Sequence, residues 1–376
     1  MTERLARLDK GILLTSLLML GFGIVFVYSS SFAIASQNFG GSDYFLARHI
    51  TRAAFGLLCF VVFINIDYHT IGKYSGIAYI CAVVMLVYVL TLPESTAING
   101  AKRWITIGVI RFQVSEFARM VLIITLAVQF DKFGDRIREG KVFIQQVIRI
   151  GIICVLIVAE PDFSTALLIG CIALCILFVS GAKTLHVAAI VGSLIPLAVI
   201  AVSTSSYRLN RVLGFLNMSE TRDTIGYQAY QSLIGLGHGG LFGTGLGQGE
   251  QKYFYLPEPH TDFVFSILGE EVGFVGLMVV LALFGVIICR GMRIALRAPD
   301  KMGQVMAFGL TFMIGMYVIL HACVNTGIVP TTGLPLPFLS YGGMSLIFTM
   351  CSMGILLNIS SQVRDMHVST TAKRRI

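Results

Sequence analysis

Residues 253–289 read YFYLPEPHTDFVFSILGEEVGFVGLMVVLALFGVIIC. The first part of this stretch is polar and contains Asp262, and an apolar run long enough to cross a bilayer follows at once. An ionisable residue at the edge of a membrane is costly, so it needs a partner or a function. The stretch therefore predicts a membrane helix that begins beside a candidate functional acid.

The composition of the whole chain predicts many helices of the same kind. Of the 376 residues, 56% are hydrophobic and 13% are charged, and the mean hydropathy is +0.81. Soluble domains carry about 25% charged residues. Because a backbone in lipid must satisfy its own hydrogen bonds, such apolar runs form helices and not open sheets. The sequence predicts an all-α polytopic membrane protein, with residues 1–376 in a single transmembrane domain.

We expect about ten membrane helices, because that many apolar runs approach the length required by a bilayer core of about 30 Å. The expected spans are Ile12–Phe32, Ile50–Ile66, Tyr74–Leu92, Val114–Phe130, Phe143–Ala159, Phe163–Ser180, Leu185–Val202, Phe263–Cys289, Val305–Val324 and Met344–Ile359. The first run is too long for the apolar region of a signal peptide, so it is predicted to be a membrane helix.

The basic residues predict the orientation, because cytoplasmic loops carry an excess of Lys and Arg. Most of the 28 Lys and Arg residues fall on one side when both termini are placed in the cytoplasm. This asymmetry explains the net charge of +8, so nucleic acid is not an expected partner. Residues 203–262, between the seventh and eighth expected helices, then form a long external loop. Because the loop is rich in Gly and aromatic residues, we expect it to be ordered and functional.

All eight cysteines fall inside apolar runs, and none has the spacing of a metal site. We expect them to be small buried hydrophobes without disulfides. The external loop also contains GLGHGGLFGTGLGQG at residues 235–249. Two interpretations stay open for this glycine-rich run: tight turns that need positive φ, or a backbone that approaches a ligand closely. A nucleotide-binding loop is not favoured, because no strand–turn–helix context surrounds the run.

Four polar constellations lie at the expected outer ends of different helices, and each has a plain structural interpretation. Thr261 or Asp262 is placed to cap the helix that begins just after them. Likewise, the carboxylates of residues 160–162 are placed to cap the span that begins at Phe163. Glu116 and Arg119 are spaced i,i+3 and can form a local ion pair. The run 99–104 contains the only Trp, which is a common residue of the aromatic belt.

Taken together, these constellations favour a site. Four carboxylates and several cations gather at the outer ends of different spans, which lipid headgroups do not require. The carboxylates are Glu116, Glu160, Asp162 and Asp262. Such an arrangement suits an anionic amphiphile and acid–base chemistry on it. Glu270 and Glu271 lie deeper in their span, and we expect them to face protein or water and to be structural.

The same segments resemble one family. The motifs NGAKRWITIG (99–108), FQVSEFARM (112–120), EPDFSTA (160–166), HTDF (260–263) and PTTGLPLPFLSYGG (330–343) are similar to those of the SEDS proteins, which include FtsW, RodA and SpoVE. The resemblance covers nearly the whole chain in the same order. The form of the last motif is more similar to the FtsW branch than to the RodA branch.

The resemblance implies a glycosyltransferase that polymerises lipid II into glycan strands on the outer face of the bacterial cytoplasmic membrane, for septal wall synthesis in cell division. It implies that Asp262 is the catalytic general base. It also implies a class B penicillin-binding protein, a transpeptidase, as a partner, together with other divisome membrane proteins. The expected substrates are lipid II and the growing glycan strand.

The resemblance also implies supporting residues. Glu116, Arg119, Asp162 and Arg48 occupy positions that match family motifs, with Arg119 in place of the usual Lys. Further candidates for binding the pyrophosphate or shaping the site are Lys102, Arg103, Arg208, Arg211, Glu258 and His260. No metal ligand set is evident, although a divalent cation (Mg²⁺ or Mn²⁺) near Asp162 or Glu116 stays open. Three departures from the family pattern, Val114, Ser164 and His321, affect local geometry and leave Asp262 in place.

Three alternative functions remain open at this point. A flippase for lipid II also needs buried charges and broken helices. A non-catalytic scaffold for division needs no base at Asp262. A role in cell elongation uses the same chemistry at a different place in the cell.

Overall fold

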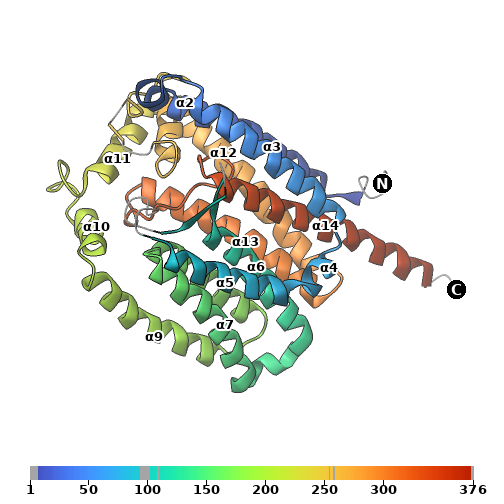
Figure 1. The fold of residues 1–376 in the computed structure, drawn as a ribbon. Helices are drawn as coiled ribbons and strands as arrows, with labels where there is room; N and C mark the ends of the chain where they lie inside the picture. Colours follow the sequence, from blue (N-terminus) through green and yellow to red (C-terminus); the bar gives the residue numbers. More distant parts are fainter. Residues whose placement is uncertain (1–6, 94–101, 108–109, 254, 257–258, 374–376) are drawn as a thin grey trace.

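The computed structural model describes residues 7–93, 102–107, 110–253, 255–256 and 259–373 of the chain. These residues form a helical bundle with one small hairpin (Figure 1). The elements are α2 (Lys10–Phe39), α3 (Tyr44–Asn65), α4 (Tyr68–Lys73), α5 (Ser75–Thr91), β1 (Trp104–Ile107), β2 (Ile110–Gln113), α6 (Val114–Phe133), η2 (Gly134–Arg138), α7 (Gly140–Ala159), α8 (Phe163–Val179), α9 (Thr184–Ser203), α10 (Ser206–Leu216), α11 (Tyr227–Gly239), α12 (Val264–Arg297), α13 (Lys301–Asn325) and α14 (Gly343–Lys373).

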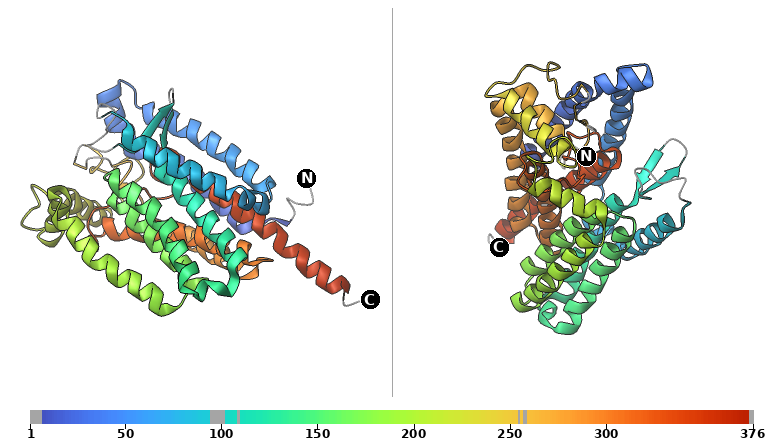
Figure 2. Two further views of the ribbon diagram at one scale, coloured as in Figure 1. Left: turned by 60° about the horizontal axis from the view of Figure 1, so that its bottom comes forward. Right: turned by 90° about the vertical axis from the view of Figure 1, so that its left-hand side faces the viewer.

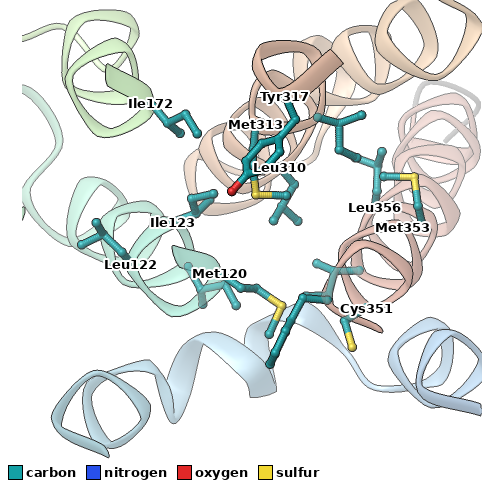
Figure 3. Packing of buried hydrophobic residues seen from close by; sticks show 14 of the residues in the cluster. Met120, Leu122, Ile123, Ile172, Leu310, Met313, Tyr317, Cys351, Met353 and Leu356 are labelled. Carbon is teal, nitrogen blue, oxygen red and sulfur yellow. The ribbon is translucent and has the colours of Figure 1, made fainter. Parts of the chain in front are cut away.

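The core lies where α6, α8, α13 and α14 meet. Figure 3 shows the side chains that these helices contribute to it, namely Met120, Leu122, Ile123, Ile172, Leu310, Met313, Tyr317, Cys351, Met353 and Leu356. Helix α14 also packs along α3, and α12 packs along α13 and α2. By contrast, α9 has no buried residue and lies at the edge of the bundle (Figure 1). Its apolar side chains are therefore placed to face lipid.

The all-α, multi-pass architecture predicted from the sequence is confirmed. Each of the ten expected spans overlaps a separate helix. Within the described ranges, seven helices have the length and composition to cross a membrane: α2, α3, α7, α9, α12, α13 and residues 343–363 of α14. Helices α5 and α8 are shorter apolar helices. The start of α2 and the end of α14 lie at the same end of the bundle (Figures 1 and 2).

Two regions differ from the expected pattern. The segment before α6 contains an antiparallel hairpin in which Trp104 pairs with Gln113, and the hairpin projects from one edge of the bundle (Figure 2). The described part of the expected external loop, residues 203–262, contains α10 and α11, so much of it is helical. Its glycines made helix difficult to predict from composition alone.

The glycine-rich run forms tight turns, as the first of the two interpretations predicts. Gly243, Gly245 and Gly247 have φ values of 80°, 106° and 81°. A Cβ atom on Gly243 would lie 2.2 Å from the carbonyl oxygen of Glu271. The backbone of the glycine-rich run therefore lies close to α12 of the protein itself. The second interpretation expected it to lie close to a ligand.

The glycine-rich run supplies hydrogen-bond partners at a point where α12 is interrupted. Gly273 has φ 68° and ψ −173°, so the helix is interrupted there. The loop supplies the missing partners: the amide of Phe274 donates to the carbonyl of Gly240 (2.9 Å), and the amide of Thr244 donates to the carbonyl of Glu270 (2.9 Å). A broken helix at membrane depth is tolerated only where protein satisfies its backbone.

Glu270 and Glu271 are buried and structural, as predicted. Glu271 is paired with Lys252 and accepts a hydrogen bond from Ser29. Glu270 accepts a hydrogen bond from the backbone amide of residue 250 (2.9 Å), which ties the loop to α12. The eight cysteines are free, and the prediction that they are buried is wrong for most of them: only Cys351 is buried, five are half-buried, and Cys81 and Cys289 are exposed. The burial of the cysteines was predicted from the apolar residues around them in the sequence. A helix surface that faces lipid also consists of apolar residues, so this pattern does not distinguish the two.

Candidate functional site

A cavity of about 1180 Å³ lies at the end of the bundle where α2 ends and α14 begins. We call it the arginine-lined cavity. Side chains from the end of α2, the starts of α3 and α14, the hairpin, α8 and α10 line it, together with residues 260–262 and 329–334. Its described lining includes five arginines, Arg52, Arg103, Arg111, Arg208 and Arg211, and two aspartates, Asp162 and Asp262. The excess of positive charge suits an anionic ligand.

Asp262 lies in this cavity, just before α12. The helix is capped by Phe263 and begins at Val264, so neither Thr261 nor Asp262 occupies the capping position considered from the sequence. The side chain of Asp262 is half-buried. Gly333 (φ 72°) brings its backbone close to this acid, because a Cβ atom there would lie 3.7 Å from Asp262 Oδ2. The acid therefore sits in a confined part of the cavity.

Arg103 and Asp162 are brought together at the cavity wall. Asp162 caps α8 by accepting a hydrogen bond from the amide of Thr165 (3.3 Å), which confirms the capping interpretation. Its Oδ2 also lies 3.6 Å from Arg103 Nε. Arg103 donates to the carbonyl oxygens of Glu160 and Pro161 as well. These acceptors hold the guanidinium of Arg103 in a fixed place beside the cavity.

Glu160 follows the last residue of α7 and is fully buried. Neither of its carboxylate oxygens has a hydrogen-bond partner among the described residues. Burial and the nearby charge of Asp162 raise the pKa of Glu160 to about 8, and Arg103 only partly opposes them. At neutral pH the carboxyl therefore carries a proton for much of the time.

Glu160→Gln is expected to stabilise the protein at high pH. A carboxyl whose pKa is raised on folding binds more protons in the folded state, so stability falls as pH rises from about 4.5 to about 8. The contribution is at most about 1.4 kcal/mol per pH unit. Thermal unfolding in detergent at a series of pH values should show a smaller loss for the variant than for wild type. Parallel curves for the two proteins would contradict this account of Glu160.

Glu116 and Arg119 form a buried ion pair inside α6, as the local interpretation predicts. Arg119 Nη1 lies 3.4 Å from Glu116 Oε1, and its guanidinium lies 4.4 Å from the centre of the Tyr317 ring. Neither residue lines the arginine-lined cavity. The pair therefore joins α6 to α13 and lies outside the lining of the cavity.

The other predicted cations divide into two groups. Arg208 lies 5.2 Å from the ring centre of Phe163, and Arg211 donates to the carbonyl of Thr331 (3.0 Å), so both arginines of α10 are fixed at the cavity. Arg48 is exposed and lies 4.1 Å from the ring centre of Tyr44, outside the cavity lining. Lys102 is likewise outside that lining.

His260 lines the cavity and packs against two rings. The ring centre of His260 lies 4.6 Å from that of Phe45 and 5.5 Å from that of Tyr341. His260 thus forms part of the cavity wall beside Asp262. Glu258, the other residue expected to shape the site, lies outside the described residues.

Several cavity residues escaped the sequence analysis. Arg52 lies one helical turn after Arg48, and its guanidinium lies 4.7 Å from the ring centre of Tyr341. Arg111 comes from β2, whose hairpin the sequence did not predict. Arg52 could have been predicted as a site residue together with Arg48, because residues four apart lie on the same face of a helix.

The described carboxylates do not fit a dedicated metal site. Asp162 already interacts with Arg103 and the amide of Thr165, and Glu116 is paired with Arg119. No group of three or more His, Cys, Asp or Glu side chains in the described part of the chain is arranged to hold a metal ion.

The sequence of the chain matches the sequences of one protein family over nearly its whole length. The model of the family described as "Cell cycle protein" (FtsW/RodA/SpoVE) matches residues 10–365. A probable peptidoglycan glycosyltransferase FtsW of Trichlorobacter lovleyi is 38% identical over 362 residues, which cover 96% of this chain and 95% of that protein. Stage V sporulation protein E of Bacillus subtilis is 38% identical over 371 residues, which cover 97% of this chain and 100% of that protein.

Solved structures agree with the sequence comparison. A chain of a peptidoglycan synthase complex, solved to describe the coordination of polymerization and crosslinking, has a TM-score of 0.79 and 26% identity and covers 95% of this chain and 98% of its own. The rod shape determining protein RodA of Thermus thermophilus has a TM-score of 0.71 and 25% identity and covers 94% of this chain and 96% of its own.

Proposed function

Because this chain belongs to the FtsW/RodA/SpoVE family of cell cycle proteins, we propose that it is a peptidoglycan glycosyltransferase of cell division that polymerises lipid II into glycan strands. The reaction takes place on the outer face of the bacterial cytoplasmic membrane, at the end of the bundle that carries the arginine-lined cavity. Residues 1–376 act as a single transmembrane domain, and both chain ends lie in the cytoplasm.

One observation carries this proposal: an acid and an excess of arginines share one large cavity. Ligand pockets for single small molecules measure about 300–1,000 Å³. The cavity of about 1180 Å³ has room for parts of two saccharide substrates. Asp262 supplies a base, and the arginines supply charge complementary to the pyrophosphate groups of lipid-linked donors and acceptors.

The reaction is a direct displacement at C1 of the MurNAc residue that ends the growing strand. The 4-hydroxyl of GlcNAc on incoming lipid II attacks this carbon, and Asp262 accepts the hydroxyl proton. The new C1–O bond forms while the bond from C1 to the pyrophosphate oxygen breaks, and undecaprenyl pyrophosphate leaves with the bonding electrons. A single displacement on an α-linked donor gives a β-linkage without a covalent glycosyl-enzyme.

The fixed arginines stabilise the negative charge that develops on the leaving group. Arg103 is held by Asp162 and two carbonyl oxygens, and Arg211 is held by the carbonyl of Thr331. Guanidinium groups that are already oriented need little reorganisation during the reaction. Arg52, Arg111 and Arg208 line the same cavity and contribute to the same charge complement.

The partner we propose is a class B penicillin-binding protein. The solved chain that covers 95% of this one comes from a peptidoglycan synthase complex concerned with polymerization and crosslinking. A transpeptidase partner supplies the crosslinking that a glycosyltransferase lacks. Other divisome membrane proteins complete the assembly.

Proteoliposomes containing the purified protein and its transpeptidase partner test the proposed function. With labelled lipid II outside the vesicles, the account predicts glycan strands that lysozyme digests. Transfer of lipid II between leaflets without strand formation would contradict polymerisation and favour a flippase. Protein heated to unfolding before reconstitution is the control.

A further inference from the structure

The backbone on which Asp262 sits is held at three consecutive carbonyl groups. The carbonyl oxygen of His260 accepts a hydrogen bond from the amide of Tyr341 (2.7 Å). The carbonyl of Thr261 accepts one from Ser340 Oγ (2.7 Å), and the carbonyl of Asp262 accepts one from Asn325 Nδ2 (3.2 Å). Two segments far away in the sequence thus hold the same three residues.

Asn325, the last residue of α13, is fully buried, and its amide group is oriented by several contacts. Besides the bond to Asp262, Nδ2 donates to the carbonyl of His321 (2.9 Å), and Oδ1 accepts from the amide of Ser266 in α12 (3.2 Å). An amide whose donor and acceptor are both engaged cannot rotate without breaking buried hydrogen bonds. Asn325 therefore links α13, the start of α12 and Asp262.

Ser340 lies in an equally rigid turn. Its hydroxyl accepts a hydrogen bond from the amide of Leu336 (2.8 Å) while it donates to the carbonyl of Thr261. Phe338 in the same turn is buried and has φ 66°, a conformation that persists only where the surroundings fix it. Gly23 of α2 makes room for this turn, because a Cβ atom there would lie 2.0 Å from the carbonyl oxygen of Phe338.

We infer that Asn325 and Ser340 are positioning residues, which fix the backbone of Asp262 so that its carboxylate is aimed at the attacking hydroxyl. This inference rests on the proposed function. Neither side chain lines the arginine-lined cavity, so both act through the backbone and not by touching substrate. Their loss lets the segment 260–262 move, which misaligns the base and leaves the substrate-binding arginines unchanged.

Ser340→Ala and Asn325→Ala are expected to lower kcat by about 10- to 100-fold, because small misplacements of a catalytic group have effects of that size. The KM for lipid II should change little. The measurement is steady-state polymerisation by purified protein in proteoliposomes, well below the unfolding temperature of each variant. Ser340→Thr keeps the hydroxyl and should recover most of kcat.

Ser352→Ala is the matched control. Ser352 in α14 is also fully buried, and its hydroxyl donates to the backbone carbonyl of Phe348 (2.8 Å) within the same helix. It should lower thermal stability by an amount comparable to Ser340→Ala and leave kcat unchanged. The double variant Ser340→Ala with Asn325→Ala should lose less activity than the product of the two single losses, because both act on one segment.

The possible outcomes distinguish failure of the positioning role from failure of the proposed function. If wild type polymerises lipid II and Asp262→Asn does not, while both positioning variants keep a normal kcat, the positioning role is wrong and the function stands. If Ser340→Ala and Ser352→Ala lower kcat by the same factor, the effect is general destabilisation and the inference also fails. If wild type makes no strands, the proposed function itself fails.

Discussion

Replacing Asp262 with Asn is expected to lower the rate of glycan polymerisation by about 10²- to 10⁴-fold, the contribution typical of a general base. Asn has nearly the same shape but cannot accept the proton of the attacking hydroxyl. Asn325 donates its hydrogen bond to the backbone carbonyl of residue 262, so a change of the side chain there leaves this bond intact. A cell whose sole copy carries Asp262→Asn should form filaments, since septal synthesis stops while growth continues.

The control for this variant is a second acid of the segment between α9 and α12. Asp223→Asn removes a carboxylate with 87% of its side chain exposed, paired only weakly with Arg222 (3.7 Å), and outside the cavity lining. It should divide and polymerise normally. Thermal unfolding of Asp262→Asn close to wild type would show that its loss is chemical. Normal septation by cells carrying Asp262→Asn would instead favour a scaffold role.

Arg119→Met is expected to destabilise the protein by about 3–5 kcal/mol, because it leaves Glu116 as a buried charge without its partner. The two side chains are 3% and 4% exposed, so water does not compensate for the loss. The contact with Tyr317 is lost as well. Thermal or denaturant unfolding in detergent measures the effect, which should appear as a large drop in midpoint.

The double variant Glu116→Gln with Arg119→Met should recover most of that stability, since it removes both charges together. It should also recover polymerisation at low temperature, because neither residue of the pair lines the cavity. Full stability with no activity in the double variant would contradict a structural role. It would place the pair in catalysis, as the family resemblance alone suggests.

The helices were predictable because each apolar run has to bury its backbone polar groups within itself. Periodicity was not needed, and even α9, which packs on little else, followed from its hydropathy. The break at Gly273 could not be predicted, because it depends on amides and carbonyls supplied by a loop about 30 residues earlier. A helical sequence does not show which backbone groups another segment will satisfy.

The site was predictable in part for a similar reason. Asp262, Asp162, Arg103, Arg208, Arg211 and His260 share the cavity that their position at helix ends predicts. Arg48 and Lys102 were expected there but lie outside the lining, because proximity in sequence to a site does not fix the direction of a side chain. Asn325 and Ser340 carry no charge and look like ordinary buried residues, so only the distances reveal what they hold.

The most direct test of the account is the initial rate of glycan-strand formation by purified wild type and Asp262→Asn in matched proteoliposomes with labelled lipid II. Lipid II binding is measured on the same samples. The account predicts equal binding and a rate for the variant at least about 100-fold below wild type. A variant that binds lipid II equally and builds strands at the wild-type rate would contradict it.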